Sequence, residues 1–314
     1  MFLCVSLNPA IDKRLRLERL QLGRVNRASQ VTPAAGGKAA HVAMVLRTLG
    51  ADPLWLGFAG GPTGAALVEG LKAMSIRAEA VATANATRMN LEILDKDGTV
   101  TEILEPGPPI TGEELERLQD SFKLALRESV GKTTVILSGS LPAGVPEDYY
   151  ATLVELGHHC ECRVFVDTSG EPLRQALRAH PSFVKPNREE AERLTGCAID
   201  GTASARNVLK RIIREGAQAA AISLGSGGLV WQGTQGKEAL FARAPEMTAR
   251  SAVGSGDSTL AGFAFAEDQG LEVEEVLRLA AACGAANCLA EGPGRARAGD
   301  IERLKKEIQV EILE

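Results

Sequence analysis

The feature that most constrains the fold of this chain is an alternation of short apolar runs with longer segments at helical spacing. Residues 3–7 and 54–58 are apolar runs of strand length, and between them residues 37–49 place Ala40, Ala43 and Leu46 close to helical spacing. The pattern continues with helices expected at 62–73, 113–128, 146–156, 171–179, 188–194, 203–215, 257–267 and 273–290, and strands at 134–137, 164–166, 183–184, 219–223 and 229–232. Strands that alternate with helices form βαβ units, so the sequence predicts an α/β fold with a mostly parallel sheet.

Two stretches break this alternation. Residues 15–20 with 28–32, and 89–94 with 99–104, have the pattern of β-hairpins, and the second turns at Asp97-Gly98. We expect them to form a small antiparallel sheet inserted between the helices. The sequence therefore predicts one domain over residues 1–314, with a β lid formed by residues 13–35 and 86–106.

Charge and apolar content exclude several classes of protein. The 35 Lys and Arg against 40 Asp and Glu give a net charge of −5, which argues against a nucleic-acid or anionic-membrane partner bound through bulk charge. The apolar run near the N-terminus is too short for a signal peptide, and no later run reaches the roughly 18 residues of a membrane span. The 6 cysteines show no framework spacing, as expected for reduced thiols. We expect a cytoplasmic protein.

One cluster of metal-ligand residues needs separate treatment. His158-His159-Cys160-Glu161-Cys162 contains good zinc ligands. Adjacent ligands on one short segment cannot close a tetrahedron alone, however, and the sequence has no second Cys/His pair elsewhere. A helix end that leads into a strand at residues 163–167 is the favoured interpretation.

Two glycine-rich turns open expected helices. At Gly36-Gly37-Lys38 the glycines let a ligand approach the backbone, and the N–H groups of a helix start favour anions or sugar oxygens, although a tight turn would look the same. At residues 254–258 the sequence Gly-Ser-Gly-Asp-Ser adds a carboxylate, Asp257. Its N–H groups could stabilise a transferring phosphoryl group while Asp257 takes a proton from the attacking hydroxyl. Asp257 could equally be a helix cap.

Two further motifs have a structural and a functional interpretation. Asn187 and Glu190, three residues apart on a first helical turn, could hold hydrated Mg²⁺ near phosphates, but a capping box is favoured on local grounds. Residues 223–228 form a glycine turn between two expected strands, which a simple hairpin would also explain. Neither GxxxxGK(S/T) nor a strand-linked GxGxxG is present, so Walker-type and Rossmann interpretations fail.

Taken in order with Asn-Pro-Ala-Ile-Asp at 8–12, Thr-Arg-Met-Asn at 87–90 and Ser-Gly-Ser-Leu-Pro at 138–142, these motifs resemble the ribokinase-like PfkB sugar kinases from about residue 3 to about residue 295. Glu-Pro-Gly-Pro at 105–108 adds to a likeness to the hexose-phosphate branch, which holds 1-phosphofructokinase, tagatose-6-phosphate kinase and the minor 6-phosphofructokinase. The resemblance implies a three-layer α/β/α sandwich with a β lid. It also implies transfer of phosphate from ATP to a ketohexose phosphate.

Fructose 1-phosphate, giving fructose 1,6-bisphosphate, is the first choice of substrate that the resemblance implies. Tagatose 6-phosphate and fructose 6-phosphate are alternatives, as is an unphosphorylated sugar or nucleoside. A non-catalytic sugar-phosphate sensor would be expected to lack Asp257 or the glycine turn, and both are present.

The resemblance also assigns residues. Asp257 would be the catalytic base, and the N–H groups of Gly254, Ser255 and Gly256 would form the anion hole. The sugar side comprises Asp12, Gly36, Gly37 and Lys38, with further contacts from Asn90, Ser138 and Gly139. The phosphate of the substrate would be bound by Arg88, joined by Arg24, Arg27 and Lys38, although a solvated surface charge is an equal alternative for those three. ATP would contact Lys185, Asn187, Ser223, Leu224, Gly225, Ser226, Gly227, Gly228, Gly256, Ala281 and Ala285.

Cations and a partner follow from the same resemblance. Glu190 with Asn187 would organise Mg²⁺ through water. A K⁺ ion would be held by the carbonyls of Ser251, Val253, Asn287, Ala290 and Gly292. Lid sheets pair in relatives, so a homodimer through the lid is expected.

One motif departs from the family pattern. The family usually has GGKGxNxA, with the Asn touching the sugar, whereas here Ala39 replaces Gly and His41 replaces Asn. His41 can still donate a hydrogen bond but is larger, so the departure implies an altered sugar pocket and leaves the phosphoryl-transfer chemistry untouched.

Overall fold

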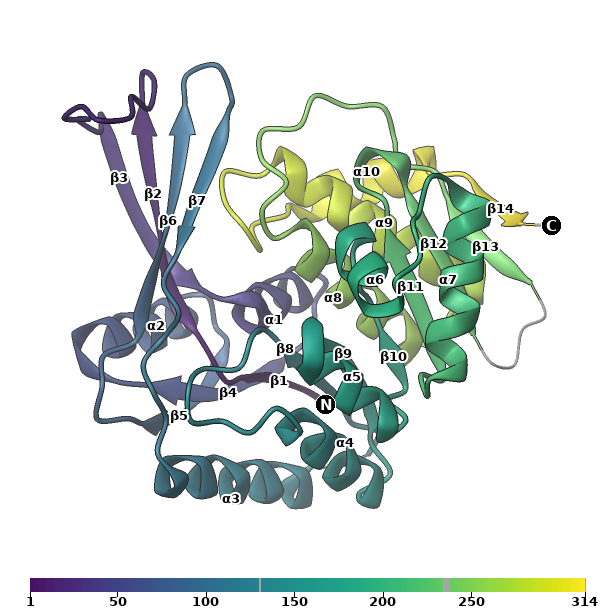
Figure 1. Cartoon of the computed structure of the whole chain (residues 1–314), viewed down its shortest axis with the longest axis horizontal. Helices are drawn as coiled ribbons and strands as arrows, with labels where there is room; N and C mark the ends of the chain where they lie inside the picture. The colour runs from purple at the N-terminus through teal and green to yellow at the C-terminus, as the bar shows by residue number, and fades with distance from the viewer. Residues whose placement is uncertain (130, 234–237, 314) are drawn as a thin grey trace.

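A ten-stranded sheet forms the centre of the computed structural model, which describes residues 1–129, 131–233 and 238–313 (Figure 1). Its strand order is β14-β13-β12-β11-β10-β9-β8-β1-β4-β5. The strands are β1 (Phe2–Ser6), β4 (Pro53–Ala59), β5 (Arg77–Ala82), β8 (Thr134–Ser138), β9 (Arg163–Asp167), β10 (Phe183–Val184), β11 (Ala219–Ser223), β12 (Leu229–Gly233), β13 (Ala239–Ala242) and β14 (Val310–Leu313). From β5 to β11 every neighbouring pair is parallel, and β12, β13 and β14 add antiparallel pairs at one edge. The predicted mostly parallel sheet is confirmed.

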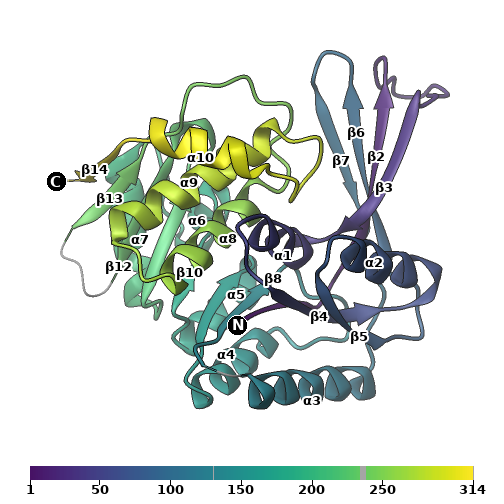
Figure 2. The ribbon, with the colours of Figure 1, turned by 180° about the vertical axis from the view of Figure 1, so that it is seen from behind.

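Helices cover both faces of this sheet, as the view from behind also shows (Figure 2). One face packs against α1 (Lys38–Thr48), α2 (Gly61–Ala73), α8 (Ser255–Asp268), α9 (Val273–Leu289) and α10 (Ala298–Glu307). The other packs against α3 (Gly112–Glu128), α4 (Tyr149–His159), α5 (Gly170–Arg178), α6 (Arg188–Thr195) and α7 (Thr202–Arg214). Strands such as β1 and β8 are buried along their whole length because helices cover both sides, which explains why their sequences do not alternate. The result is the expected three-layer sandwich.

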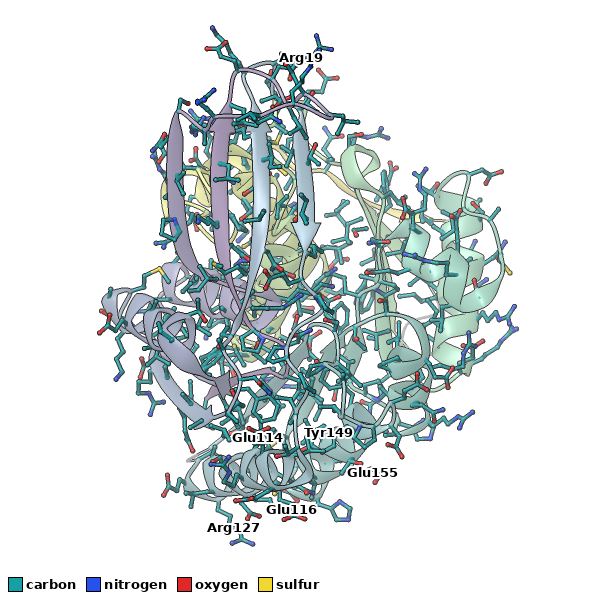
Figure 3. The ribbon with its side chains drawn as sticks, turned by 60° about the vertical axis from the view of Figure 1, so that its left-hand side comes forward. Arg19, Glu114, Glu116, Arg127, Tyr149 and Glu155 are labelled. Atoms are coloured by element: carbon teal, nitrogen blue, oxygen red, sulfur yellow. The ribbon has the colours of Figure 1, made fainter. Side chains whose placement is uncertain are left out.

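A separate four-stranded sheet, the lid, projects from the sandwich in the order β3-β2-β6-β7 (Figure 3). It consists of β2 (Ala10–Leu17), β3 (Gln30–Gly36), β6 (Arg88–Asp95) and β7 (Val100–Leu104). Both hairpins are antiparallel, and Gly98 (φ 91°) supplies the left-handed turn between β6 and β7. The two hairpins are therefore antiparallel as expected, whereas β2 and β6, which join them, pair in parallel. Two hairpins placed side by side in the same orientation produce this mixed sheet.

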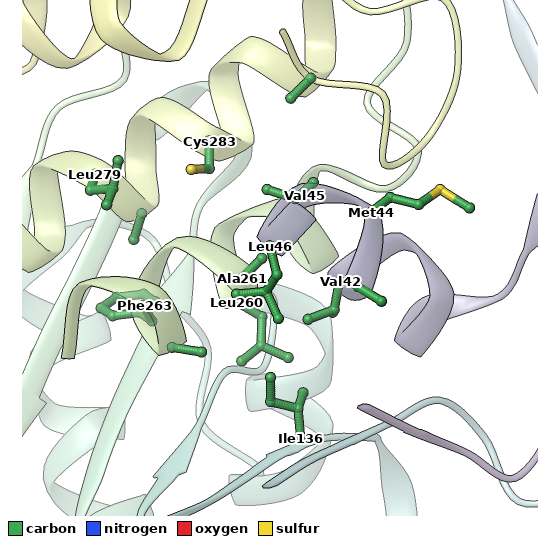
Figure 4. Close-up of a cluster of buried hydrophobic side chains, with 14 of the residues drawn as sticks. Val42, Met44, Val45, Leu46, Ile136, Leu260, Ala261, Phe263, Leu279 and Cys283 are labelled. Atoms are coloured by element: carbon green, nitrogen blue, oxygen red, sulfur yellow. The ribbon is translucent and has the colours of Figure 1, made fainter. Parts of the chain in front are cut away.

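The core on the face of α1, α8 and α9 is built largely from small and aliphatic side chains (Figure 4). Aromatic residues are only 4% of the chain, so few large side chains are available to fill this core. The helices pack close together instead. A β-carbon at Gly262 of α8 would lie 2.6 Å from Ala280 Cα of α9, so only glycine allows the observed separation. Val45 and Leu46 of α1 are fully buried in the same cluster. The N-terminal turns of α1 and α8 are therefore held in a tightly packed frame.

Several elements differ from the sequence expectation. The strands β5, β13 and β14 and the helix α10 were not predicted, and α4 begins at Tyr149 rather than 146. The strands β5 and β14 lie at the sheet edges with half-exposed polar residues, so their sequences lack the buried-strand signal. The helix α4 ends at His159 and β9 begins at Arg163, as the helix-end interpretation of residues 158–162 requires. Over the ranges that the structure describes, no helix is long and apolar enough to cross a membrane.

Candidate active site

A cavity of about 1330 Å³ lies between the lid and the carboxyl ends of the central parallel strands. Asn8 follows β1, Gly139 follows β8, Asp167 ends β9, Lys185 follows β10 and Ser223 ends β11. Ligands of open α/β sheets bind at this edge because the strand ends open into loops there. Side chains from the lid and from the first turns of α1 and α8 complete the wall of the cavity. The motifs that are far apart in the sequence thus converge on one cavity.

Three side chains form a continuous chain of contacts at the lid end of this cavity. His41 Nε2 lies 2.7 Å from Asp12 Oδ2, and His41 Nδ1 lies 2.8 Å from Asp257 Oδ2. Asp12 Oδ1 also accepts a hydrogen bond from Asn90 Nδ2 at 2.9 Å. Asp12 and Asn90 come from neighbouring lid strands, His41 from α1 and Asp257 from α8. Two carboxylates from different parts of the fold are therefore bridged by one imidazole.

The charges of this bridge follow from its geometry. Burial alone would lower the pKa of His41, but hydrogen bonds with Asp12 and Asp257 outweigh it and raise the pKa to about 10. Burial would raise the pKa of Asp12, but its hydrogen bonds with His41 and Asn90 make the net shift downward. The raised pKa favours a protonated ring between the two carboxyl groups at neutral pH.

The glycines of the first motif make room for Asp12. A β-carbon at Gly36 would stand 2.1 Å from Asp12 Oδ2, so any other residue would displace the carboxylate. Gly37 adopts φ 86°, and α1 begins directly after it at Lys38. The structure shows a tight turn at this motif, in which Gly36 leaves room for Asp12 and the Gly37 N–H donates to Asp12 Oδ2 at 3.4 Å.

The turn at 254–258 opens α8 toward the cavity. Gly254 has φ 77° and is the N-cap, and no side-chain cap hydrogen bond is present there. Asp257 contacts His41 instead, and the arrangement that the helix-cap alternative would require is not present. The N–H of Ser255 donates to the Ala252 carbonyl at 3.1 Å, which leaves Gly254 and Gly256 as the better donors of the predicted anion hole.

A buried carboxylate and two lysines form the floor of the cavity. Asp167 Oδ2 lies 3.5 Å from Lys38 Nζ, and Asp167 Oδ1 lies 3.8 Å from Lys185 Nζ. Burial raises the pKa of Asp167, but both ammonium groups outweigh it, so the net shift is downward. A β-carbon at Gly256 would stand 3.2 Å from Lys185 Nζ, so this lysine approaches the start of α8. The ammonium of Lys185 and the N–H groups at the start of α8 therefore lie close together, and this arrangement favours the binding of an anion.

The arginines predicted to bind the substrate phosphate lie in different places. Arg88 lines the cavity, and its Nη1 and Nη2 donate to the carbonyls of Glu105 and Asn8. Its Nε is buried without a protein partner. Arg24 and Arg27 are exposed in the tip loop of the lid that also carries Arg19, which Figure 3 labels, and they do not line the cavity. Within a single chain, Arg88 therefore lines the cavity, whereas Arg24 and Arg27 do not.

The opposite end of the cavity carries the residues predicted to contact ATP. Asn187 and Glu190 form a complete capping box at the start of α6, as local reasoning favoured. The hairpin between β11 and β12 turns at Gly225 (φ 62°) and Gly228 (φ 107°). The predicted residues that line this end are Lys185, Asn187, Glu190, Ser223, Leu224, Gly225, Ser226, Gly228, Gly256, Ala281 and Ala285.

Some predicted positions do not line the cavity. In the described part of the chain these are Arg24, Arg27, Gly36, Ser138, Gly227, Ser251, Asn287, Ala290 and Gly292. Among the carbonyls predicted for a K⁺ ion, that of Val253 accepts from Asn287 Nδ2 at 2.7 Å, and that of Asn287 accepts from the Ala290 N–H at 3.0 Å. Each carbonyl retains a second lone pair for a cation.

Sequence reasoning missed Asp167, Glu92 and Glu102, which also line the cavity. Asp167 carried a signal, because it ends an apolar strand and precedes Thr168-Ser169-Gly170 at the edge where ligands bind. Glu92 lies in the lid, where Arg14 Nε and Nη2 donate to it at 2.9 and 2.8 Å and Ser251 Oγ donates at 3.1 Å. The Arg14 contacts join two lid strands, and the Ser251 contact joins the lid to the loop before α8. No local sequence pattern predicts them.

Comparisons with known proteins agree with this geometry. A family model described as pfkB family carbohydrate kinase matches residues 5–297. A protein of Xanthomonas campestris pv. campestris named 1-phosphofructokinase is 37% identical over 284 residues, which are 88% of each chain. One of Borreliella burgdorferi with the same name is 34% identical over 290 residues, 92% of each chain. The structure of phosphofructokinase-2 from Escherichia coli in complex with potassium superposes with a TM-score of 0.89 at 24% identity and 98% coverage of each chain.

Proposed function

The chain belongs to the pfkB family of carbohydrate kinases, and from this premise we propose that it transfers the γ-phosphoryl group of ATP to a hydroxymethyl group of a ketohexose phosphate. Fructose 1-phosphate is the first choice, in line with the names of the relatives. The observation that carries the proposal is the position of Asp257. Its buried carboxylate stands in the first turn of α8, next to the Gly254–Gly256 turn and in contact with His41 from the sugar side.

The proposed reaction uses the residues of the cavity in two groups. Asp257 accepts the proton of the attacking hydroxyl, since its Oδ2 contacts His41 and its Oδ1 remains for the substrate. The N–H groups of Gly254 and Gly256, with the ammonium of Lys185 nearby, stabilise the charge of the transferring phosphoryl group. Phosphoryl transfer needs little more than such positioning and charge stabilisation.

In this proposal the sugar phosphate and the nucleotide occupy different parts of the cavity. Asp12 and Asn90 would hold sugar hydroxyls, with Gly37 and Gly139 in the cavity wall near them. Arg88 would bind the existing phosphate, because a guanidinium presents several donors to an anion. Lys38 lies between the two ends, 3.5 Å from Asp167 and 4.0 Å from Glu190, where it can contact phosphate from either substrate.

The proposal also includes a magnesium ion, which Glu190 and Asn187 would hold through water. Within residues 1–129, 131–233 and 238–313, no group of three or more His, Cys, Asp or Glu is arranged to hold a metal ion. Kinase Mg²⁺ is held mainly by phosphates and water with one or two carboxylates. Glu190 uses Oε2 in the capping box and keeps Oε1 for such a water, with Asn187 beside it. When bound with ATP, Mg²⁺ would neutralise phosphate charge.

A monovalent cation beside the start of α8 is a further part of the proposal. The E. coli phosphofructokinase-2 of the comparison is in complex with potassium. In this chain the carbonyls of Ser251, Val253, Asn287, Ala290 and Gly292 would supply the ligands for K⁺. Higher activity in potassium than in sodium or tetramethylammonium buffers is expected, and equal activity in all three would remove the site.

We also propose that the whole chain works as one domain with its lid, in the cytoplasm, and pairs with a second copy through that lid. Strand alternation places Leu15, Val31, Leu91 and Ile103 on the lid face opposite Asp12 and Asn90. Val31 and Ile103 are 48% and 52% exposed in the single chain, which is unfavourable unless another surface covers them. Sedimentation should show a dimer at micromolar protein concentration, and a monomer there would contradict the pairing.

The experiment that tests the function is a panel of acceptors assayed for ATP consumption. Fructose 1-phosphate, fructose 6-phosphate and tagatose 6-phosphate are compared with free fructose, ribose and a nucleoside. The proposal expects turnover that depends on an added sugar phosphate. Saturation by free sugars at lower concentration would indicate a kinase of unphosphorylated sugars, and binding of sugar phosphate without turnover would indicate a sensor.

A further inference from the structure

His41 joins the two carboxylates at the sugar end of the cavity, and the reaction proposed above leaves it without a role. Both of its ring nitrogens are engaged, at 2.7 Å from Asp12 and 2.8 Å from Asp257. The side chain is only 6% exposed, so it does not offer a free donor to solvent. The backbone at Gly294 also packs closely against it, since a β-carbon there would stand 2.9 Å from His41 Cα. Both ring nitrogens of His41 therefore contact protein carboxyl groups, and neither is left free to bind a ligand.

The two short contacts fit a charged ring. A neutral imidazole has one N–H donor and one acceptor, so it would place a lone pair against one of the carboxylates. An imidazolium donates to both. The charged groups that act on the ring are Asp12 from β2, Asp257 from α8 and Glu102 from β7. Lys38 of the same helix acts on Asp257, and Arg88 of β6 acts on Asp12. Carboxylates dominate this set, and they stabilise the proton on the ring.

The bridge also connects two separate parts of the fold. Asp12 belongs to a lid strand, whereas Asp257 belongs to α8, which is packed in the core against α1. Contacts that orient Asp12 on the sugar are therefore transmitted through one rigid ring to the carboxylate beside the reacting hydroxyl. A misplacement of reacting groups by about 1 Å can lower a rate about 100-fold.

We propose that His41 is a positioning residue, which as an imidazolium holds Asp257 in orientation for the acceptor hydroxyl and couples it to the sugar-binding Asp12. This inference rests on the proposed function and names a residue of the same site. It assigns His41 to the orientation of the base, and not to direct contact with the sugar.

The first test compares His41→Asn with the matched control His159→Asn, a substitution at an exposed histidine on α4. Asparagine keeps a donor but carries no charge and is too short to reach both carboxylates. For His41→Asn we expect kcat with fructose 1-phosphate to fall about 10- to 100-fold, with the KM for ATP unchanged within about twofold. The control should retain wild-type kinetics. A His41→Asn variant that folds and keeps wild-type kcat overturns the proposal.

The second test needs no turnover and uses the wild-type chain. Two-bond ¹H–¹⁵N spectra of the imidazole rings at pH 8.5 distinguish charged from neutral histidines. We expect His41 to read as charged at this pH, and to become neutral in Asp257→Asn or Asp12→Asn. A neutral His41 in the wild type overturns the proposal even where His41→Asn fails to fold. A wild type inactive on the whole acceptor panel overturns the proposed function and the positioning role with it. An active wild type beside an unaffected His41→Asn overturns the positioning role alone.

Discussion

Asp257 Oδ2 lies 2.8 Å from His41 Nδ1, although 216 residues separate the two along the chain. A carboxylate in the first turn of a helix commonly accepts a hydrogen bond from a backbone N–H of its own helix. Asp257 is instead tied to a different helix and faces the cavity. Its role must therefore be sought in what the cavity binds, and the relationship to His41 makes the carboxylate part of the sugar end of the site.

Arg88→Ala should weaken the binding of the sugar phosphate selectively. Loss of a charge-assisted hydrogen bond costs about 1.5–3 kcal/mol, or about 10- to 150-fold in affinity. We expect the KM for the sugar phosphate to rise accordingly, while the KM for ATP stays near the wild-type value. Steady-state kinetics with each substrate varied in turn measure both.

The control for this variant must reproduce its structural effect, since Arg88 also donates to two backbone carbonyls. Arg117→Ala removes a comparable contact, from Arg117 Nη2 to the Ala82 carbonyl at 2.9 Å, outside the cavity. Equal losses of ATP and sugar-phosphate affinity in Arg88→Ala would show that Arg88 is not the phosphate ligand.

Glu92→Gln should destabilise the lid and its attachment to the loop before α8. Glu92 accepts two hydrogen bonds from Arg14, and the two residues are 5% and 9% exposed. Breaking a buried ion pair leaves an uncompensated charge and costs about 3–5 kcal/mol. Chemical denaturation followed by circular dichroism measures the loss in the free energy of unfolding.

Glu18→Gln serves as the matched control for Glu92→Gln, because Glu18 also pairs with a cation of the lid. It lies 3.2 Å from Lys96, with side-chain exposures of 83% and 74%. Exposed pairs of this kind contribute about 0–1 kcal/mol, so this variant should be nearly neutral. Similar losses in the free energy of unfolding for the two variants would mean that the buried Arg14–Glu92 pair stabilises the fold no more than an exposed pair does.

The stability of the wild type should depend on His41 in one pH window. The pKa of His41 is raised from 6.5 to about 10 in the folded chain. Between these values the folded state holds a proton that the unfolded state has lost, so raising the pH favours unfolding. The stability advantage of the wild type over His41→Asn should be full below about pH 6.5 and decline toward pH 10. Denaturation of both proteins at several pH values checks this, and a difference independent of pH would contradict the charged bridge.

Much of the fold could be predicted because its signals are local. Buried strands such as β1 and β8 are continuous apolar runs, and turns such as Gly98 carry the required glycine. The same holds for the capping box of Asn187 and Glu190, which lies within one helical turn. Edge strands such as β5 escaped prediction because half-exposed residues lack that pattern.

The cavity was less predictable because its contacts span the chain. The motifs placed Asp12, His41 and Asp257 at one site, but only the packing of the lid, α1 and α8 reveals that His41 bridges the other two. The pairing of Asp167 with Lys38 and Lys185 likewise depends on strand order in the sheet. Engagement of the Ser255 N–H by Ala252 is a property of the turn geometry and has no signature in residue type.

The most direct test of the account is kcat of Asp257→Asn with ATP and fructose 1-phosphate, compared with Asp268→Asn at the other end of α8 as the matched control. Asparagine preserves the size of the side chain but cannot accept the proton of the hydroxyl. Loss of a general base typically lowers the rate about 100- to 10,000-fold. The account predicts a fall of this size for Asp257→Asn, a normal KM for ATP, and wild-type kcat for Asp268→Asn. A folded Asp257→Asn variant with kcat near that of the wild type would contradict it.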